Sequence, residues 1–177
     1  MKRRLLFACC AAFLTGCAAI PTPEMHSSSG RFSLRATRSG KTENVAGRWR
    51  LSQTDRTTEL TLMTPLYGIL ARITSGPEGA LLERPNKGEN GEIRASSADE
   101  LMQQHLGFSL PVDMLSAWIS GHPWSGEKFQ ATEGGFEQAG WFVAVKRRKS
   151  DSTPALLTVS HPETASHAAL SVNLSIE

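Results

Sequence analysis

Residues 30–51, GRFSLRATRSGKTENVAGRWRL, decide the fold. Apolar side chains alternate with polar ones on both sides of a central Ser39-Gly40 pair. The apolar positions are Phe32, Leu34 and Ala36 before the pair, and Val45, Gly47, Trp49 and Leu51 after it. A period of two places successive side chains on opposite faces of a strand, and a glycine-containing pair between two such runs is typical of a hairpin turn. The stretch therefore predicts an antiparallel hairpin with one apolar face.

The same alternation recurs along most of the remaining chain. It is found at Leu60 and Leu62, at Ile69, Ala71 and Ile73, at 80–83, at 129–132, at Trp141, Val143 and Val145, at Leu157 and Val159, and at Leu170, Val172, Leu174 and Ile176. Turn residues such as Gly76-Pro77 and Gly134-Gly135 separate these runs. About ten or eleven short strands at hairpin spacing predict a mainly β protein, either an antiparallel barrel or a strongly curled sheet.

Helical periodicity is confined to residues 97–121. Ser97 with Glu100 three places later forms a capping box, and the helix that it starts ends before Gly107. A second helix is predicted with Pro111 at its first position, and its apolar residues follow helical spacing. These are Val112, Leu115, Trp118 and Ile119. Two helices this short can cover one face of a curled sheet or plug one end of it.

The N-terminus has the features of an export signal. Three basic residues at 2–4 precede an apolar run from 5 to 14, which is too short to span a bilayer. Leu14-Thr15-Gly16-Cys17 resembles a bacterial lipobox, and such a motif implies removal of residues 1–16 and a diacylglycerol and an N-acyl chain on Cys17. The alternative is an ordinary secretory signal with an incidental cysteine. Ala18 permits export to the outer membrane, since lipoproteins retained in the inner membrane carry an aspartate there.

Residues 17–29 are predicted to be a lipid-bearing tether, and residues 30–177 a single domain. The segment before Gly30 contains Pro21, Pro23 and three consecutive serines and shows no apolar period, which is typical of a solvated linker. About 160 residues suffice for one domain with a substantial core.

Charge and cysteine content exclude several classes of function. Loss of residues 1–16 removes three of the 19 Lys and Arg and none of the 17 Asp and Glu, so the mature chain is nearly neutral and lacks the basic surplus of a nucleic-acid-binding protein. Cys9 and Cys10 lie in the signal and Cys17 carries lipid, which leaves no thiol for a disulfide or a metal site. No cofactor is predicted beyond the lipid itself.

Catalytic motifs are also missing from the sequence. Gly40-Lys41-Thr42 ends like a phosphate-binding loop, but Arg35 stands where that motif needs glycine, and the triplet joins two strands. The five histidines show no metal-ligand spacing, and no serine lies in a Gly-x-Ser-x-Gly turn. We therefore do not predict an enzyme.

An ordered series of short motifs resembles the LolB family of outer-membrane lipoproteins. The motifs are Gly30-Arg31-Phe32, Trp49, Thr64-Pro65-Leu66-Tyr67-Gly68, Ala98-Asp99-Glu100-Leu101, Gly107, Leu110-Pro111-Val112, Leu115, Trp118-Ile119-Ser120-Gly121-His122-Pro123 and Gln138 to Trp141. The resemblance implies an unclosed antiparallel barrel with a short helical lid, anchored to the periplasmic face of the outer membrane. It also implies a monomer that takes triacylated lipoproteins from the periplasmic chaperone LolA and inserts them into the membrane lipid.

The resemblance also suggests which residues carry the function. An apolar cavity for acyl chains would be lined by inward or lid-facing residues, namely Phe32, Trp49, Leu62, Leu115, Trp118 and Ile119. An ordinary packed core would use the same positions. The turn with Leu66 and Tyr67 would project one apolar residue into the membrane, although Leu66 could instead fold back onto the sheet. The alternative function is a structural or inhibitory outer-membrane lipoprotein with a packed barrel that binds a periplasmic protein.

Overall fold

The alternating segments form a single antiparallel sheet. The computed structural model describes residues 25–66, 68–85, 91–165 and 167–177, and within these ranges the sheet has eleven strands. They are β1 (His26–Arg38), β2 (Lys41–Gln53), β3 (Thr58–Thr64), β4 (Gly68–Gly76), β5 (Gly79–Glu83), β6 (Glu92–Ala95), β7 (Phe129–Thr132), β8 (Gly135–Gln138), β9 (Trp141–Arg148), β10 (Pro154–His161) and β11 (Ala169–Ile176).

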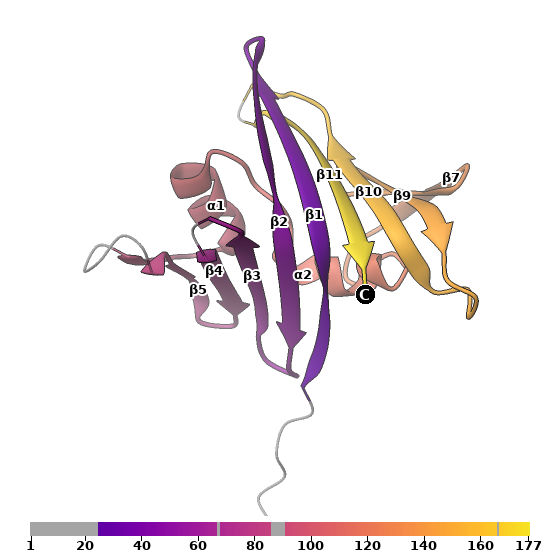
Figure 1. Ribbon diagram of the computed structural model, residues 1–177, viewed down its shortest axis with the longest axis horizontal. Coiled ribbons are helices and arrows are strands. Elements are labelled where there is room, and N and C mark those ends of the chain that lie inside the picture. Colours follow the sequence, from indigo (N-terminus) through magenta and orange to yellow (C-terminus); the bar gives the residue numbers. More distant parts are fainter. Residues whose placement is uncertain (1–24, 67, 86–90, 166) are drawn as a thin grey trace, which may run out of the picture.

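The sheet is curled but not closed. Its order is β6-β5-β4-β3-β2-β1-β11-β10-β9-β8-β7, so the first strand lies at the centre, between β2 and β11 (Figure 1). Among the described residues, the two outermost strands β6 and β7 do not pair with each other. The prediction of an unclosed antiparallel barrel is therefore confirmed, and the opening lies between the middle segments of the chain rather than at its ends.

The predicted hairpin is the longest unit of the sheet. β1 and β2 pair without interruption from His26 opposite Gln53 to Arg38 opposite Lys41. Ser39 and Gly40 have φ values of 50° and 79°, the left-handed values that a tight two-residue hairpin turn requires. β1 begins at His26, earlier than the predicted domain start, because residues 26–29 pair with the end of β2. The serines assigned to the tether therefore belong to the sheet.

Two helices connect the two outer edges of the sheet. These are α1 (Ala98–Leu106) and α2 (Val112–Ile119), which follow β6 and precede β7. The Ser97 hydroxyl accepts a hydrogen bond from the backbone N–H of Glu100, and Gly107 ends α1 with a φ of 79°, as predicted. Pro111 precedes α2 rather than forming its first turn. In Figure 1 both helices lie against the same face of the curled sheet, so they form the predicted lid.

The core lies between the lid and the concave face of the sheet. Inward-facing residues of β1–β5 and β8–β11 join apolar residues of both helices in one cluster. Gly30 allows a close approach at its centre, because a Cβ there would lie 1.7 Å from the carbonyl oxygen of Ser175. Trp49, opposite Gly30 in the register, donates its indole N–H to that same oxygen at 3.2 Å. The large ring thus covers the glycine.

Two strands were not predicted from the sequence. β6 and β8 are only four residues long, and they contain few apolar residues to establish a period. Both form because the adjoining strands β5 and β9 offer unpaired backbone groups, with Leu82 opposite Ile93 and Val143 opposite Phe136. Sheet pairing, rather than local sequence preference, determines these two short strands.

Candidate functional site

An apolar pocket lies beneath the lid, at the centre of the curled sheet. Four strands and the lid contribute to its lining. The residues are Phe32 and Leu34 of β1, Trp49 and Leu51 of β2, Leu60 and Leu62 of β3, Val172 and Leu174 of β11, Phe108 and Leu110 of the helix connection, and Leu115 and Ile119 of α2. Every one is apolar, and none can ionise, so the pocket suits hydrocarbon and offers no group for acid–base chemistry.

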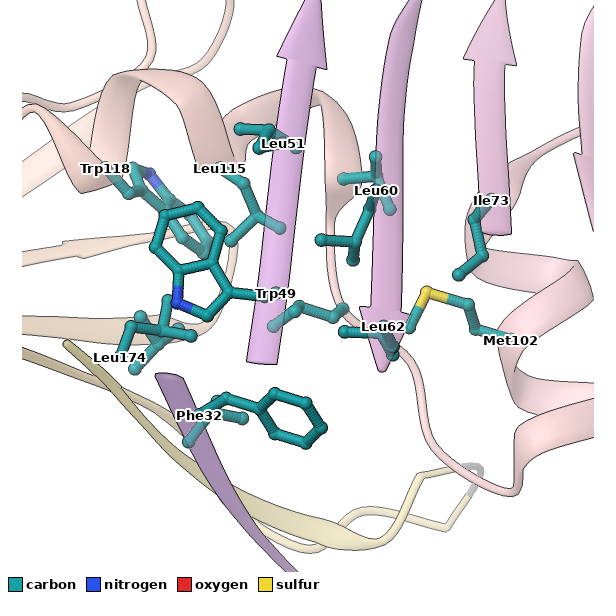
Figure 2. Close-up of a cluster of buried hydrophobic side chains, with 14 of the residues drawn as sticks. Phe32, Trp49, Leu51, Leu60, Leu62, Ile73, Met102, Leu115, Trp118 and Leu174 are labelled. Carbon is teal, nitrogen blue, oxygen red and sulfur yellow. The ribbon is translucent and has the colours of Figure 1, made fainter. Parts of the chain in front are cut away.

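Strand register brings these residues together from distant parts of the sequence. Phe32 lies opposite Leu174 in the β1–β11 pair, and Trp49 lies opposite Leu62 in the β2–β3 pair. Figure 2 shows these side chains gathered in one cluster with Leu115 of α2. Because inward positions recur every second residue, the alternation that predicts the strands also builds the pocket floor.

The pocket is almost filled by its own side chains. The space open to the centre of a water-sized sphere is about 20 Å³, which is room for about one water molecule. This space is too small for an acyl chain. In this closed form the apolar faces of lid and sheet pack against each other.

Five of the six predicted cavity residues line this pocket, namely Phe32, Trp49, Leu62, Leu115 and Ile119. Trp118 does not. It is fully buried on another side of α2, where its ring meets Phe136 edge-on at 6.5 Å and Trp141 at 6.2 Å. Helical spacing places Trp118 and Leu115 next to each other on the apolar face of α2. Because the sheet curls around this short helix, Leu115 faces the pocket while Trp118 packs against Phe136 and Trp141.

Gln138 fixes Trp118 and was not identified from the sequence as a structural centre. Its Oε1 accepts from the indole N–H of Trp118 at 2.9 Å and from the backbone N–H of Trp124 at 2.9 Å. Its Nε2 donates to the carbonyl oxygens of Trp124 and Glu127. All of the amide's hydrogen-bonding capacity is used in a 1% exposed position, so α2 is tied to β8. The sequence signal for Gln138 was its place at the start of the Gln138 to Trp141 motif that resembles the LolB family.

The turn between β3 and β4 presents an apolar residue to solvent. The Leu66 side chain is 85% exposed, the highest value among the exposed large apolar residues of the described chain. Gly68 closes the turn with a φ of 64°, which a glycine adopts without strain. Leu66 therefore does not fold back onto the sheet. Tyr67 and the predicted lipid-bearing Cys17 lie outside the described residues.

A second, more polar pocket of about 380 Å³ lies on the other side of the helix connection. Asp99 lies at its rim, where it accepts a hydrogen bond from the Ser109 hydroxyl and approaches His167 Nε2 to 3.8 Å. In a serine hydrolase the histidine lies between serine and aspartate, whereas here the aspartate lies between the other two. Among the described residues, no group of three or more His, Cys, Asp or Glu is placed to hold a metal ion.

Comparison with known proteins identifies the family. A model of the family described as "Outer membrane lipoprotein LolB" matches residues 24–177. The chain belongs to the LolB family. It is 35% identical over 159 residues to the outer-membrane lipoprotein LolB of Cupriavidus metallidurans, covering 80% of this chain and 76% of that protein.

More distant LolB proteins match over similar lengths. The one from Neisseria meningitidis serogroup A is 31% identical over 151 residues, which are 78% of this chain and 73% of that protein. The one from Bordetella pertussis is 31% identical over 166 residues, or 86% and 81%. No helix in the described part of the chain is both long and apolar enough to cross a bilayer. The LolB family match thus extends over the whole sheet and lid.

Proposed function

We propose that this protein receives lipoproteins from the periplasmic chaperone LolA, holds their acyl chains between sheet and lid, and inserts them into the inner leaflet of the outer membrane. As a LolB family member it is an outer-membrane lipoprotein of the Lol sorting system. The family match over residues 24–177 carries the proposal. Transfer needs no covalent chemistry, which agrees with a pocket lined only by apolar side chains.

Acyl chains need such a pocket because water is a poor environment for them. Each methylene exposed to water costs about 0.8 kcal/mol, so a lipoprotein with three chains must be handed over without crossing open solvent. The twelve apolar residues around the closed pocket offer a comparable environment once the lid has moved. In this mechanism the arriving acyl chains replace the side chains of the lid as neighbours of Phe32, Trp49 and Leu62.

The exposed turn would then assist delivery. Burying one leucine in lipid gains about 1.5 to 3 kcal/mol, which is too little to hold the domain on a membrane but enough to favour one orientation. Leu66 lies at the tip of the turn that follows β3, and β3 also carries the pocket residues Leu60 and Leu62. Insertion of Leu66 would therefore bring the pocket close to the bilayer surface.

The alternative is a packed barrel that binds a periplasmic protein. Geometry alone is compatible with it, because the pocket is nearly filled in the closed form. Two observations favour transport. Relatives in three genera carry the name outer-membrane lipoprotein LolB. Leu66, the most exposed large apolar residue of the described chain, is at a turn, where an isolated barrel would gain from a polar side chain.

The test is Leu66→Glu in the lipid-anchored protein. A charge at an 85% exposed position should leave thermal unfolding unchanged, leave uptake of lipoprotein from the chaperone intact, and reduce delivery to liposomes. Met25→Glu, at a 66% exposed position just before β1 and at the opposite end of β3 from this turn, is the matched control and should deliver normally. Normal delivery by Leu66→Glu would refute the role of the turn, and failure of both wild type and variant to accept cargo would refute the transport function.

A further inference from the structure

An open hollow with two arginines adjoins the Leu66 turn. The β1–β2 hairpin extends past the end of β3 (Figure 1), and the hollow lies where the hairpin passes the β3–β4 turn. Its lining comes from β1, β2 and the end of β3. The residues are Arg31, Phe32, Ala46, Gly47, Arg48, Met63, Thr64 and Pro65. Leu66 follows Pro65 directly, so cationic and apolar groups meet at one place on the surface.

The two arginines lie directly opposite each other. Arg31 and Arg48 are register partners in the β1–β2 pair, and both are exposed on the outer face of the sheet. Like charges at opposed positions destabilise a strand pair. Arg48 is partly neutralised by Glu177 at 2.6 Å, whereas no carboxylate of the described chain lies within ion-pair distance of Arg31. The opposed arginines therefore do not stabilise the hairpin, and Arg31 can bind an external anion.

We propose that this hollow binds the phosphate of an anionic phospholipid when Leu66 enters the bilayer. The inference rests on the proposed membrane role of Leu66 and adds a headgroup site to it. Guanidinium groups form paired hydrogen bonds with phosphate oxygens, and they are the preferred side chains for this purpose. Pro65, the neighbour of Leu66, lines the hollow together with Arg31 and Arg48, so a lipid that contacts Leu66 can present its phosphate to these arginines.

The tether is long enough for this contact. His26 pairs with Gln53 of β2, which in turn pairs with Thr58, the first residue of β3. The last residue of β3, Thr64, lies about 20 Å further along the sheet. His26 is the ninth residue after Cys17, and nine residue steps can span about 30 Å when extended. A lipid on Cys17 and the hollow beside Leu66 can therefore reach the same leaflet at the same time.

The experiment measures vesicle binding by the mature chain with Cys17→Ala, so that no lipid anchor masks the weaker contact. All described elements lie within residues 25–177, so this chain retains the complete sheet and lid. The vesicles contain phosphatidylcholine alone, or with a quarter of phosphatidylglycerol. Arg31→Gln should weaken binding to the anionic vesicles about fivefold, the effect of one basic residue at an anionic surface, and should not change binding to the neutral ones.

Three further variants separate the possible outcomes. Arg35→Gln removes the same charge further along β1, where Arg35 contacts Asn44, and should have a much smaller effect than Arg31→Gln. Glu177→Gln releases Arg48 and should strengthen binding to anionic vesicles. Leu66→Glu should weaken binding to both kinds of vesicle.

Each result has a distinct consequence. Equal losses for Arg31→Gln and Arg35→Gln would overturn the headgroup site, because they would indicate general charge attraction. Unchanged vesicle binding by Arg31→Gln together with slower uptake from the chaperone would overturn it in favour of a protein contact. An effect of Arg31→Gln without one of Leu66→Glu would retain the headgroup site while refuting the apolar turn.

Discussion

Replacing Trp118 with alanine tests whether this residue is core or cavity lining. Its side chain is fully buried, contacts Phe136 and Trp141, and donates a hydrogen bond to Gln138. Truncation of a packed tryptophan costs about 3 to 5 kcal/mol, and one lost hydrogen bond costs about 1 kcal/mol. Gln138 Oε1 keeps its second donor, the N–H of Trp124, so no acceptor is left unpaired. We expect the free energy of unfolding to fall by about 4 to 6 kcal/mol.

The assay is urea unfolding followed by circular dichroism, because the substitution removes one of the tryptophans that fluorescence would report. Trp118→Phe retains an aromatic ring but loses the indole N–H, so it should lose only about 1 to 2 kcal/mol. Binding of a fluorescent fatty acid to the folded variants is measured separately. Since Trp118 is outside the pocket lining, both variants should bind the probe like the wild type.

Leu115→Ala is the comparison from within the lining. It enlarges the closed pocket, so it should raise the affinity for the fatty acid while it lowers stability by about 2 to 5 kcal/mol. The reasoning would be refuted if Trp118→Ala lost less than about 2 kcal/mol, or if it changed fatty-acid affinity as much as Leu115→Ala does.

Two further substitutions test the sheet and the tether. Gly30→Val places a Cβ close to the Ser175 carbonyl oxygen, so the free energy of unfolding measured in urea should fall by at least about 1 to 3 kcal/mol. An unchanged free energy would show that β1 and β11 can separate at this point. Deletion of residues 19–23 makes His26 the fourth residue after Cys17, a reach of at most about 14 Å against the roughly 20 Å that the proposed Leu66 insertion requires. This deletion should impair delivery to membranes but not uptake from the chaperone. Replacing the deleted residues with a Gly-Ser segment of the same length should restore delivery. Full activity of the shortened protein would contradict the proposed orientation.

Much of this architecture was predictable because a half-buried strand has a simple period. Phe32, Trp49 and Leu62 were assigned to the inner face from alternation alone, and all three line the pocket. The two ends of α1 were also predictable from the sequence, since the capping of a helix by Ser97 and Gly107 depends little on tertiary context. The prediction that the barrel is unclosed rested on resemblance to the LolB family and not on the alternation of apolar residues.

Features that depend on long-range pairing were not predictable. The sequence placed Trp118 in the cavity because the helix has a single apolar stripe, but the curl of the sheet decides which part of that stripe faces which strand. The opposition of Arg31 and Arg48 depends on a register that connects residues 17 apart. The closed state of the pocket depends on how twelve side chains fill one volume, which no linear pattern specifies.

The closed pocket has a thermodynamic consequence for delivery. An acyl chain leaves water with a gain of about 0.8 kcal/mol per methylene whether it enters a protein or a bilayer. In the proposed mechanism part of that gain is offset in the protein, because the chain must displace lid residues such as Leu115 and Ile119 from the sheet. In the bilayer there are no such contacts to break. The difference favours release to the membrane without a nucleotide, and the strength of lid packing then sets the balance between uptake and delivery.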